Sequence, residues 1–510
     1  MLQNTITAAQ PQELRSLIHV EGYFGQAEAD LWDQLFLTAG VRNDGYSTFG
    51  TGSRRASYPK ASAAWTFTRA LGNADQRGVL SLGKVRAAYG ETGREPPVYG
   101  TLNAFAVATA FGSGFQDLIS SSQSGQGGVV RSFAEGNPAL KPERNRETEL
   151  GADFGFFDQR ADLGVTWFDK RSSEVILFVP TNLSATGYGR RLTNGASIRN
   201  KGLEVTFDAR PYTGRRLAWE VGANFGRLRG RVLSLQGAEF IPYNNEGFTG
   251  SIGTSTVGYA PGVIQGSDFA RCGRGLLLAQ SDGTTLDVDA GCGPSAKKGA
   301  LYIAEDGQPI DDPTARVIAD PNPRWTLGVN SSLRLFGNLR VSGLVDVRHG
   351  GQVYNGTRAA LLRFGTHRDT EVRDQQGVFG QNFDTREYPD VAGPGAGTVA
   401  FHTPNEWQQW FTTLGGNAGN SQAQFIEDGS FVKLRELSLQ YTISGARVRS
   451  RLGVSSVDLR VAGRNLHTWT KYRGLDPESN LGGAEYLTQG VDYFNNPQTR
   501  SFVFAVGLSR

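Results

Sequence analysis

The sequence predicts an all-β protein whose antiparallel strands form a transmembrane β-barrel. Three observations support this prediction. Apolar and polar residues alternate with a period of two along many segments, whereas helical spacing of apolar residues is rare. The alternating segments run for about 9 to 13 residues, as barrel strands do, while strands of soluble domains usually have about five or six. The connections alternate between short and long, which is typical of barrels with short turns at one rim and long loops at the other.

Composition fits this fold class and excludes several others. The chain has 510 residues, of which 38% are hydrophobic, and a mean hydropathy of −0.35. Its 52 lysines and arginines nearly balance 49 aspartates and glutamates, which argues against nucleic-acid binding through bulk charge. No apolar run has the length of a transmembrane helix. Barrel strands nevertheless have low mean hydropathy, because alternate residues face lipid and lumen.

The clearest alternation marks strands in the second half of the chain. In the segment 201–210, Leu203, Val205 and Phe207 share one face, and polar residues occupy the other. Similar runs of leucine, valine, phenylalanine and tryptophan follow, and weaker alternation predicts the remaining strands. The thirteen expected strands lie, in order, near residues 19–29, 31–43, 57–69, 79–90, 146–157, 160–170, 201–211, 216–228, 324–335, 338–349, 430–442, 456–468 and 501–510.

The long and short connections fall on opposite sides of the predicted sheet. Short turns such as Phe157-Asp158-Gln159-Arg160, Tyr212-Thr213-Gly214-Arg215 and Phe336-Gly337-Asn338 occur at alternate positions. The long segments 91–145, 171–199, 229–323, 350–429 and 470–499 all lie at the other rim. A soluble multidomain protein has no reason to obey this parity. Because bacterial single-chain barrels have even strand numbers, thirteen strands indicate a miscounted strand or an incomplete barrel.

A series of short motifs extends over essentially the whole chain. They are GYFG (22–25), LFLTAGVRNDG (35–45), YPKASAAW (58–65), GNPALKPE (136–143), IRNKGLE (198–204), DPNPRW (320–325), FIEDGSFVKLR (425–435), GRNL (463–466), YRGLDPE (472–478) and PQTRSF (497–502). Each motif is weak alone, but their order is specific. Together they resemble the C-terminal half of the SusC/RagA family of TonB-linked outer-membrane proteins, which are TonB-dependent receptors and transporters associated with nutrient uptake.

The resemblance implies a domain organisation. Family members are about twice as long and carry a signal peptide, an N-terminal β-domain, a TonB-contacting segment and a plug inside a barrel of about 22 strands. We therefore expect residues 1–510 to be the C-terminal part of the barrel, with about 13 to 14 of those strands. The signal peptide, N-terminal β-domain, plug and first strands are expected to be absent from this sequence. The chain ends in Gly507-Leu508-Ser509-Arg510, not in the aromatic residue common in the family.

The resemblance also implies a function and a set of partners. It implies TonB-dependent uptake of a nutrient, such as an oligosaccharide or a peptide, across the outer membrane of a Gram-negative-type bacterium. The implied partners are a SusD-like lipoprotein, the TonB-ExbB-ExbD system acting through the N-terminal part, and the lipid and lipopolysaccharide of the membrane. No cofactor and no nucleic acid are implied. Two alternatives stay open: a secreted, soluble β-rich glycan-binding protein or glycanase, and a passive porin or siderophore receptor.

The motifs of common enzymes are missing from the sequence. It has no G-x-S-x-G or H-E-x-x-H motif, and its five histidines are dispersed. Composition alone leaves a glycosidase carboxylate pair open, but nothing selects two residues. In the acidic segment 305–312, Gln308-Pro309-Ile310 interrupts the alternating oxygen ligands that calcium requires, so a solvated turn is expected there. We therefore expect no enzymatic activity and assign no catalytic, cofactor-binding or metal-binding residue.

Two groups of strand residues are predicted to face either the lumen of the barrel or the membrane interface. Lys201, Glu204 and Asp208 are expected to face the polar lumen, where a hydrated charge costs little free energy. Five tryptophans on or at the ends of expected strands are predicted to form aromatic girdles, with ordinary packing as the alternative. They are Trp65, Trp167, Trp219, Trp325 and Trp469.

The long loops contain candidate contact residues and a candidate cross-link. Segments 99–103 and 401–407 combine aromatic and amide side chains that suit contact with sugars or peptides, with packing inside the loops as the alternative. Cys272 and Cys292 are the only two cysteines of the chain. In an oxidising compartment a loop disulfide is predicted between them, and two unpaired thiols are the alternative.

Overall fold

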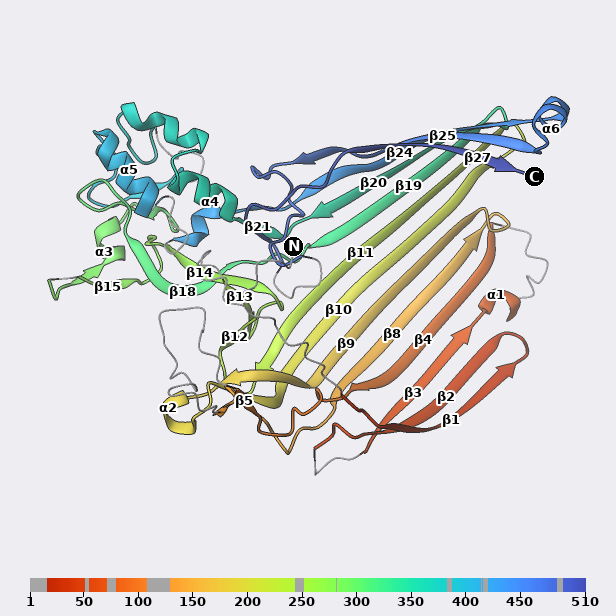
Figure 1. Ribbon diagram of the computed structural model, residues 1–510, viewed down its shortest axis with the longest axis horizontal. Helices are drawn as coiled ribbons and strands as arrows, with labels where there is room; N and C mark the ends of the chain where they lie inside the picture. The colour runs from red at the N-terminus through yellow and green to blue at the C-terminus, as the bar shows by residue number, and fades with distance from the viewer. Residues whose placement is uncertain are drawn as a thin grey trace, which may run out of the picture.

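A computed structural model describes residues 16–50, 55–70, 79–107, 129–243, 252–280, 282–382, 388–413, 415, 421–483 and 489–510. Within these residues, thirteen antiparallel strands follow one another across one large sheet in chain order (Figure 1). The strands are β1 (Val20–Leu31), β2 (Leu35–Tyr46), β3 (Arg55–Trp65), β4 (Leu80–Arg94), β8 (Glu143–Phe156), β9 (Ala161–Pro180), β10 (Arg190–Thr213), β11 (Leu217–Leu235), β19 (Trp325–Leu335), β20 (Leu339–His349), β24 (Phe431–Ser444), β25 (Ser456–Thr470) and β27 (Ser501–Ser509). The predicted number and order of strands are confirmed, and β7 (Ala134–Glu135) adds a short parallel pairing with β10.

The two faces of the sheet differ in polarity because successive residues of a strand point to opposite sides. Val205 on β10 lies opposite Val165 on β9 and Phe225 on β11, and these apolar residues belong to the outer face. Asp208 lies opposite Asp162 on the other, inner face. The alternation in the sequence therefore becomes an apolar outer surface and a charged inner surface.

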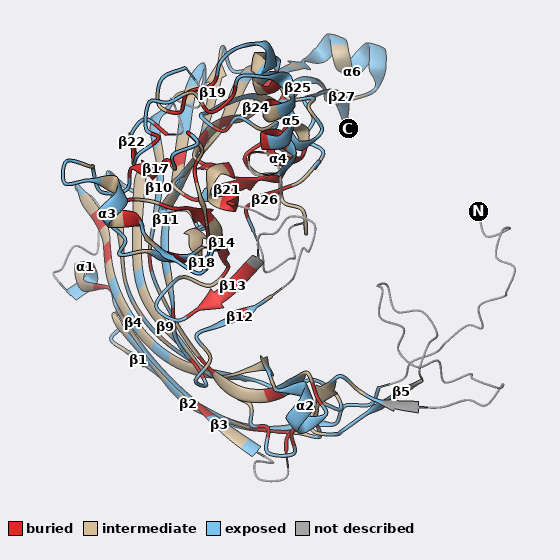
Figure 2. Ribbon diagram, turned by 90° about the vertical axis from the view of Figure 1, so that its left-hand side faces the viewer, coloured by how far each residue is buried: buried red, intermediate tan, exposed pale blue. Residues whose placement is uncertain are grey.

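The sheet curves into an open arc when seen along its strands (Figure 2). Elements of the long connections, including β12 (Phe240–Pro242) and β13 (Ile252–Thr256), lie within the outline of this arc. A Cβ added to the inner-face residue Gly230 would lie 2.9 Å from Pro261 of the same connection. The charged inner face is therefore the concave one. Within the described residues, β1 and β27 each pair with a single neighbouring strand and form the two edges.

Short turns lie at one rim of the sheet, which we call the turn rim. Phe157, Asp158 and Gln159 all have positive φ values, between 53° and 59°, as does Phe336 at 53°. Backbones in this left-handed region reverse direction within a few residues. Short helices occupy two of the other turns, namely α1 (Phe67–Ala70) and α6 (Ala446–Leu452). The long connections lie at the opposite rim, the loop rim, which confirms the predicted parity (Figure 1).

The prediction of a long loop at 171–199 is largely wrong. β9 has 20 residues and continues to Pro180, and β10 has 24 residues and begins at Arg190. Only residues 181–189 connect them, and they contain α2 (Leu183–Thr186). In the extension of β9 residues 175–179 are all apolar, and Val175, Leu177 and Val179 pack against a buried cluster that includes Val232 and Ile241, so the period of two is lost. Register shifts near Ala196 disturb the alternation further, which is why the pattern stops before the strands do.

The connections β11–β19, β20–β24 and β25–β27 fold together into one body, which we call the loop module. Its largest group of buried apolar residues draws on all three connections and includes Phe269, Trp410 and Val491. Among the residues described, no helix is long and apolar enough to cross a membrane. The remaining elements of the loop module are β14 (Val263–Phe269), β15 (Leu277–Ala279), β16 (Thr285–Asp287), α3 (Val288–Cys292), β17 (Leu301–Tyr302), β18 (Asp311–Ala319), β21 (Gln352–Asn355), α4 (Gly356–Arg363), η2 (Arg368–Asp374), β22 (Val391–Ala392), α5 (Pro404–Thr413), η3 (Gln422–Phe425), β23 (Ile426–Asp428) and β26 (Val491–Asp492). Another hairpin at this rim pairs β5 (Phe105–Val107) with β6 (Val129–Arg131).

Candidate functional site

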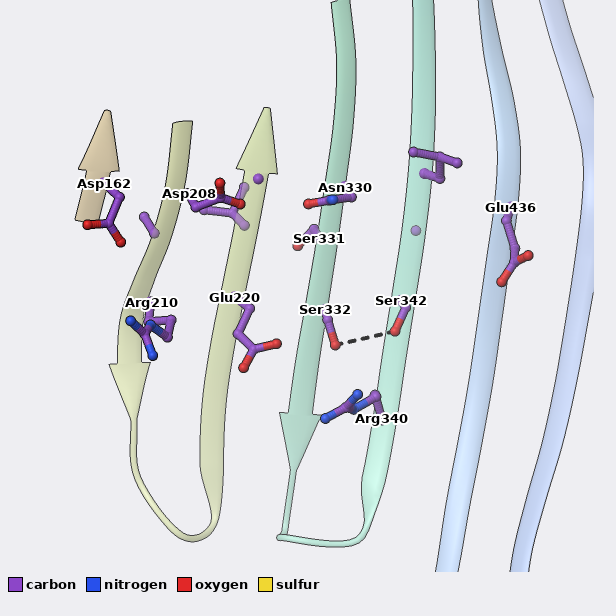
Figure 3. Close-up of a pocket in the computed structure, with 15 residues that line it drawn as sticks. Asp162, Asp208, Arg210, Glu220, Asn330, Ser331, Ser332, Arg340, Ser342 and Glu436 are labelled. Carbon is purple, nitrogen blue, oxygen red and sulfur yellow. Dashed lines mark hydrogen bonds between the residues drawn. The ribbon is translucent and has the colours of Figure 1, made fainter. Parts of the chain in front are cut away.

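A polar groove of about 690 Å³ crosses the inner face between β9 and β24 (Figure 3). It lies near the turn rim, and neighbouring strands each contribute one or two of its side chains. The polar lining residues on the inner face are Asp162, Asp208, Arg210, Glu220, Asn330, Ser332, Arg340, Ser342 and Glu436. The register of the sheet, not a local sequence motif, brings these residues together.

The geometry of the groove depends on a glycine and on fixed charge pairs. A Cβ on Gly222 would lie 2.5 Å from Asn330 Oδ1 and 2.8 Å from Asp208 Oδ1, so the absence of a side chain leaves room for both polar groups. Glu436 accepts hydrogen bonds from Arg460 at 2.6 Å and Arg464 at 3.1 Å. The groove is thus a hydrated surface of carboxylates, guanidinium groups and hydroxyls. Such a surface can bind a polar solute or the polar surface of another domain.

Of the three residues expected in the lumen, the structure places two there. Glu204 and Asp208 lie on the inner face. The prediction for Lys201 is wrong, because Lys201 shares the outer face with Leu203 and contacts Asp169, with 3.6 Å between the charged groups. Three positions separate Lys201 from Glu204, and residues an odd number of positions apart in a continuous strand point to opposite faces. The charge is tolerated because Lys201 lies beyond Trp167, on the side toward the loop rim.

A buried ionic network joins the loop module to the strands at the loop rim. The side chain of Lys433 on β24 is only 3% exposed, and its Nζ donates to Asp476 Oδ1 at 2.7 Å and also to Glu478. Arg435 donates to Glu478 Oε1 at 2.6 Å and to Asp346 Oδ2 on β20 at 2.7 Å. Three strand residues and two loop residues therefore share their charges, and Lys433 and Asp476 at the centre of the network are buried.

The network brings together residues from three of the sequence motifs. Lys433 and Arg435 come from the motif at 425–435, and Asp476 and Glu478 come from the motif at 472–478. The motif at 497–502 adds Gln498, whose Oε1 accepts a hydrogen bond from Arg435 at 3.0 Å. Segments that are weak signals separately are neighbours in space. The signal that could have identified the network is the pair of cations that interrupts the apolar alternation of β24.

Acid is expected to loosen this attachment of the loop. Burial of Glu478 would raise its pKa, but hydrogen bonds and charges from Arg435 and Lys433 outweigh burial and hold the pKa below its ordinary value. A carboxyl group with a lowered pKa stabilises the fold above its unfolded pKa of about 4.3 and loses that contribution as the pH falls through the folded value. Pepsin cleavage within 470–499 should therefore increase as the pH falls below about 4.

Glu478→Gln is the matched control for the acid prediction. Glutamine keeps the shape of the side chain but does not titrate, so the variant should lack the part of the acid-induced change that comes from Glu478. If wild type and Glu478→Gln show the same pH profile of cleavage, Glu478 does not carry the acid sensitivity.

The segment 401–407, proposed from sequence for ligand contact, instead forms part of the core of the loop module. Phe401 and Trp407 are buried, and their ring centroids are 4.3 Å apart. Their alternative role, packing inside the loops, is the one the structure supports. In the segment 99–103, Tyr99 and Leu102 are exposed, and Asn103 Oδ1 accepts from the backbone N–H of Gly136 at 2.9 Å. Tyr99 is therefore the accessible aromatic residue of the two segments.

Two further features of the loops have structural roles. The structure joins Cys272 and Cys292 by a disulfide across 20 positions of the sequence. In the acidic segment, Asp306 Oδ1 accepts from the backbone N–H of Gln308 at 2.9 Å, and the fully buried Asp312 bonds Arg316. These carboxylates stabilise turns and strands of the loop module. Within the part of the chain that the structure describes, no group of three or more histidine, cysteine, aspartate or glutamate residues could hold a metal ion.

The predicted tryptophan girdles lie on the outer face. Trp65 and Trp219 are close to the turn rim, whereas Trp167, Trp325 and Trp469 are nearer the loop rim. Trp325 contacts His349 on the neighbouring strand, with ring centroids 5.1 Å apart. The outer face therefore carries an apolar band with aromatic residues toward both ends, as a membrane-spanning wall requires.

Comparisons with known proteins agree with this architecture. A family model described as TonB dependent receptor-like, beta-barrel matches residues 3–466. TonB-dependent receptor P3 of Formosa agariphila is 25% identical over 99% of this chain and 47% of its own length. The TonB-dependent receptor SusC of Bacteroides thetaiotaomicron is 22% identical over 96% of this chain and 43% of its own.

A solved structure shows the same fold. A chain in the structure of the RagAB peptide transporter superimposes with a TM-score of 0.65 at 18% identity, covering 96% of this chain and 48% of that one. The present chain spans about half the length of the curated relatives it matches. Because the family model covers most of the chain, the chain belongs to the TonB-dependent receptor-like β-barrel family, whose SusC/RagA-type members are outer-membrane barrels.

Proposed function

We propose that this chain forms the barrel wall and extracellular loops of a TonB-dependent transporter that takes up an oligosaccharide or a peptide across the outer membrane. The observation that carries the proposal is the two-faced curved sheet. Its outer face is apolar with aromatic ends, and its concave inner face is lined with charge. The name of SusC as a TonB-dependent receptor supports TonB dependence, and the peptide transporter title of RagAB supports a peptide as one substrate class.

The proposal includes a longer parent protein. The chain matches about half of each relative, and β1 and β27 each have one paired neighbour in the described part. Further strands would close the barrel to about 22. A plug would then face the inner groove, whose charged lining suits contact with a polar domain surface. A signal peptide and an N-terminal β-domain would complete the protein.

The proposal also assigns the rims and the partners. The loop rim would face the exterior, where the loop module could meet a SusD-like lipoprotein and the substrate. The turn rim would face the periplasm, and TonB-ExbB-ExbD would act on the N-terminal part. An oxidising exterior would keep the disulfide between Cys272 and Cys292 formed. The protein would have no enzymatic activity, because transport across the membrane is its task.

Uptake measurements in the native bacterium test this proposal. Deleting the gene for the full-length protein should abolish uptake of at least one labelled oligosaccharide or peptide from a defined panel. The wild-type gene should restore uptake, but not in a strain that also lacks TonB. Uptake that persists without TonB would favour the passive porin, and loss of only ferric siderophore uptake would favour the siderophore receptor. No uptake defect with any of these solutes would contradict the proposal.

A further inference from the structure

Four arginines lie directly opposite one another across four adjacent strands on the outer face. Arg146 on β8 pairs with Arg171 on β9, Arg171 pairs with Arg199 on β10, and Arg199 pairs with Arg231 on β11. We call these four residues the arginine row. Neighbouring strands are about 4.8 Å apart, so the row spans about 14 Å. Like charges directly opposite one another on a sheet destabilise it, so the row requires an explanation other than strand pairing.

The row lies just beyond the apolar band, on the side of the loop rim. Leu150, Trp167 and Leu203 form a cross-strand row on the same face. Arg171 follows Trp167 by four residues, which corresponds to about 13 Å along the strand. Lys201 and Arg229 pair with each other between these two levels. An aromatic residue at the edge of an apolar band marks the membrane interface, so the arginines reach the level of the lipid headgroups.

Carboxylates of the protein neutralise only part of this charge. Glu91 lies 3.2 Å from Arg146, and Asp169 pairs with Arg199 and lies 3.6 Å from Lys201. The two carboxylates therefore face six cationic side chains in two neighbouring rows. The side chains of Arg146, Arg199 and Lys201 are 50%, 45% and 46% exposed, and Arg171, Arg229 and Arg231 are also exposed. The uncompensated cations are accessible from the outer face.

We propose that the arginine row binds the phosphate groups of lipopolysaccharide in the outer leaflet of the membrane. The guanidinium group presents a planar fork of donors that matches phosphate oxygens, and charge-assisted hydrogen bonds of this kind are strong. Phosphates would also relieve the repulsion among the four arginines. The inner face is hydrated and lacks the adjacent apolar band that acyl chains need. The outer face has both the arginine row for the phosphates and the apolar band for the acyl chains. The inference rests on the proposed function, because it requires the outer face to contact the outer leaflet.

Binding of lipopolysaccharide to the purified full-length protein tests this site. The protein is isolated from outer membranes in non-ionic detergent, depleted of lipid and titrated with lipopolysaccharide. Replacing Arg171, Arg199 and Arg231 together by glutamine should weaken binding about a hundredfold, since each basic side chain near an anionic surface contributes about a factor of five. The matched control replaces three exposed arginines of α6, Arg447, Arg449 and Arg451, by glutamine. It removes the same charge at the turn rim and should bind as wild type.

Two further measurements do not depend on folding of the variant. Wild-type protein should bind dephosphorylated lipopolysaccharide about a hundredfold more weakly than it binds the intact form, and inorganic phosphate at the same concentration should not compete. Equal affinity for both forms of the lipid, or equal competition by inorganic phosphate, would overturn the lipid site. An unchanged affinity of a heat-modifiable, folded arginine-row variant would also overturn it while leaving the transport proposal intact. Absence of the protein from the outer membrane would overturn both.

Discussion

Replacing Trp410 by alanine is expected to destabilise the loop module by about 3 to 5 kcal/mol. Trp410 is 2% exposed, and its ring packs against three aromatic residues, one of which, Phe269, comes from a different connection of the loop module. The ring centroids of Phe269, Phe379 and Phe401 are 5.9, 5.3 and 5.6 Å from it. Alanine would remove these contacts and leave a cavity that the antiparallel strands and short helices around it cannot close without losing their own packing.

The loss is measurable as a lower denaturant concentration for protease cleavage of the loop module in the detergent-solubilised protein. Phe364→Ala is the matched control, because Phe364 lies in the same module but is 67% exposed. Its replacement should change the cleavage midpoint little. The heat-modifiable migration of the barrel should be the same for both variants. Equal midpoints for Trp410→Ala and Phe364→Ala would show that the aromatic cluster does not hold the module together.

Replacing Lys433 by alanine is expected to have a similarly large effect, of about 3 to 5 kcal/mol. The substitution leaves the carboxylates of Asp476 and Glu478 without the cation that is buried between them. Arg435 still contacts Glu478 but not Asp476, so a buried charge stays uncompensated. The connection between β25 and β27 should detach from β24, and cleavage by protease within 470–499 should become faster by several orders of magnitude.

Two controls distinguish the cost of leaving buried carboxylates unpaired from the cost of losing any lysine. One is a surface ion pair, and the other is a triple variant without the buried charges. Lys297 pairs with Asp390 at 2.6 Å, but its side chain is 74% exposed, so Lys297→Ala should cost less than about 1 kcal/mol. Combining Lys433→Met with Asp476→Asn and Glu478→Gln removes the buried charges together and should recover most of the stability. If the triple variant is as unstable as Lys433→Ala, the cost does not come from unpaired carboxylates.

Local sequence patterns were sufficient for the strands and their order. The period of two at 201–210 is a direct consequence of the two surroundings that β10 meets, one apolar and one polar. The turns at 157–160 and 336–338 were predictable because each is a short segment between two alternating strands. The pattern ended too early at 171–199, because β9 and β10 continue beyond the apolar band and Val175, Leu177 and Val179 pack there against a buried cluster, which removes the period of two.

The groove, the buried ionic network and the loop module could not be predicted from local sequence patterns. Phe269 and Trp410 stack although 141 positions separate them, and Ser267 bonds Gln422 across 155 positions. The buried cation Lys433 lies among alternating apolar residues, and its burial is explained only by its ion pairs with Asp476 and Glu478. The inner-face position of Asp208 was correct and that of Lys201 was wrong, because Lys201 lies an even number of positions from Leu203 in β10 and therefore points outward.

The sequence by itself determined that this protein is a two-faced antiparallel wall with short turns at one rim and long loops at the other. It could do so because each strand faces lipid on one side and water on the other, and its residues therefore alternate between apolar and polar. Only the tertiary structure decided that three long loops form one packed module, that separate motifs meet in a buried ionic network, and that four arginines align on the outer face. Those features depend on cross-strand register and on contacts between distant segments, which no local pattern of residues encodes.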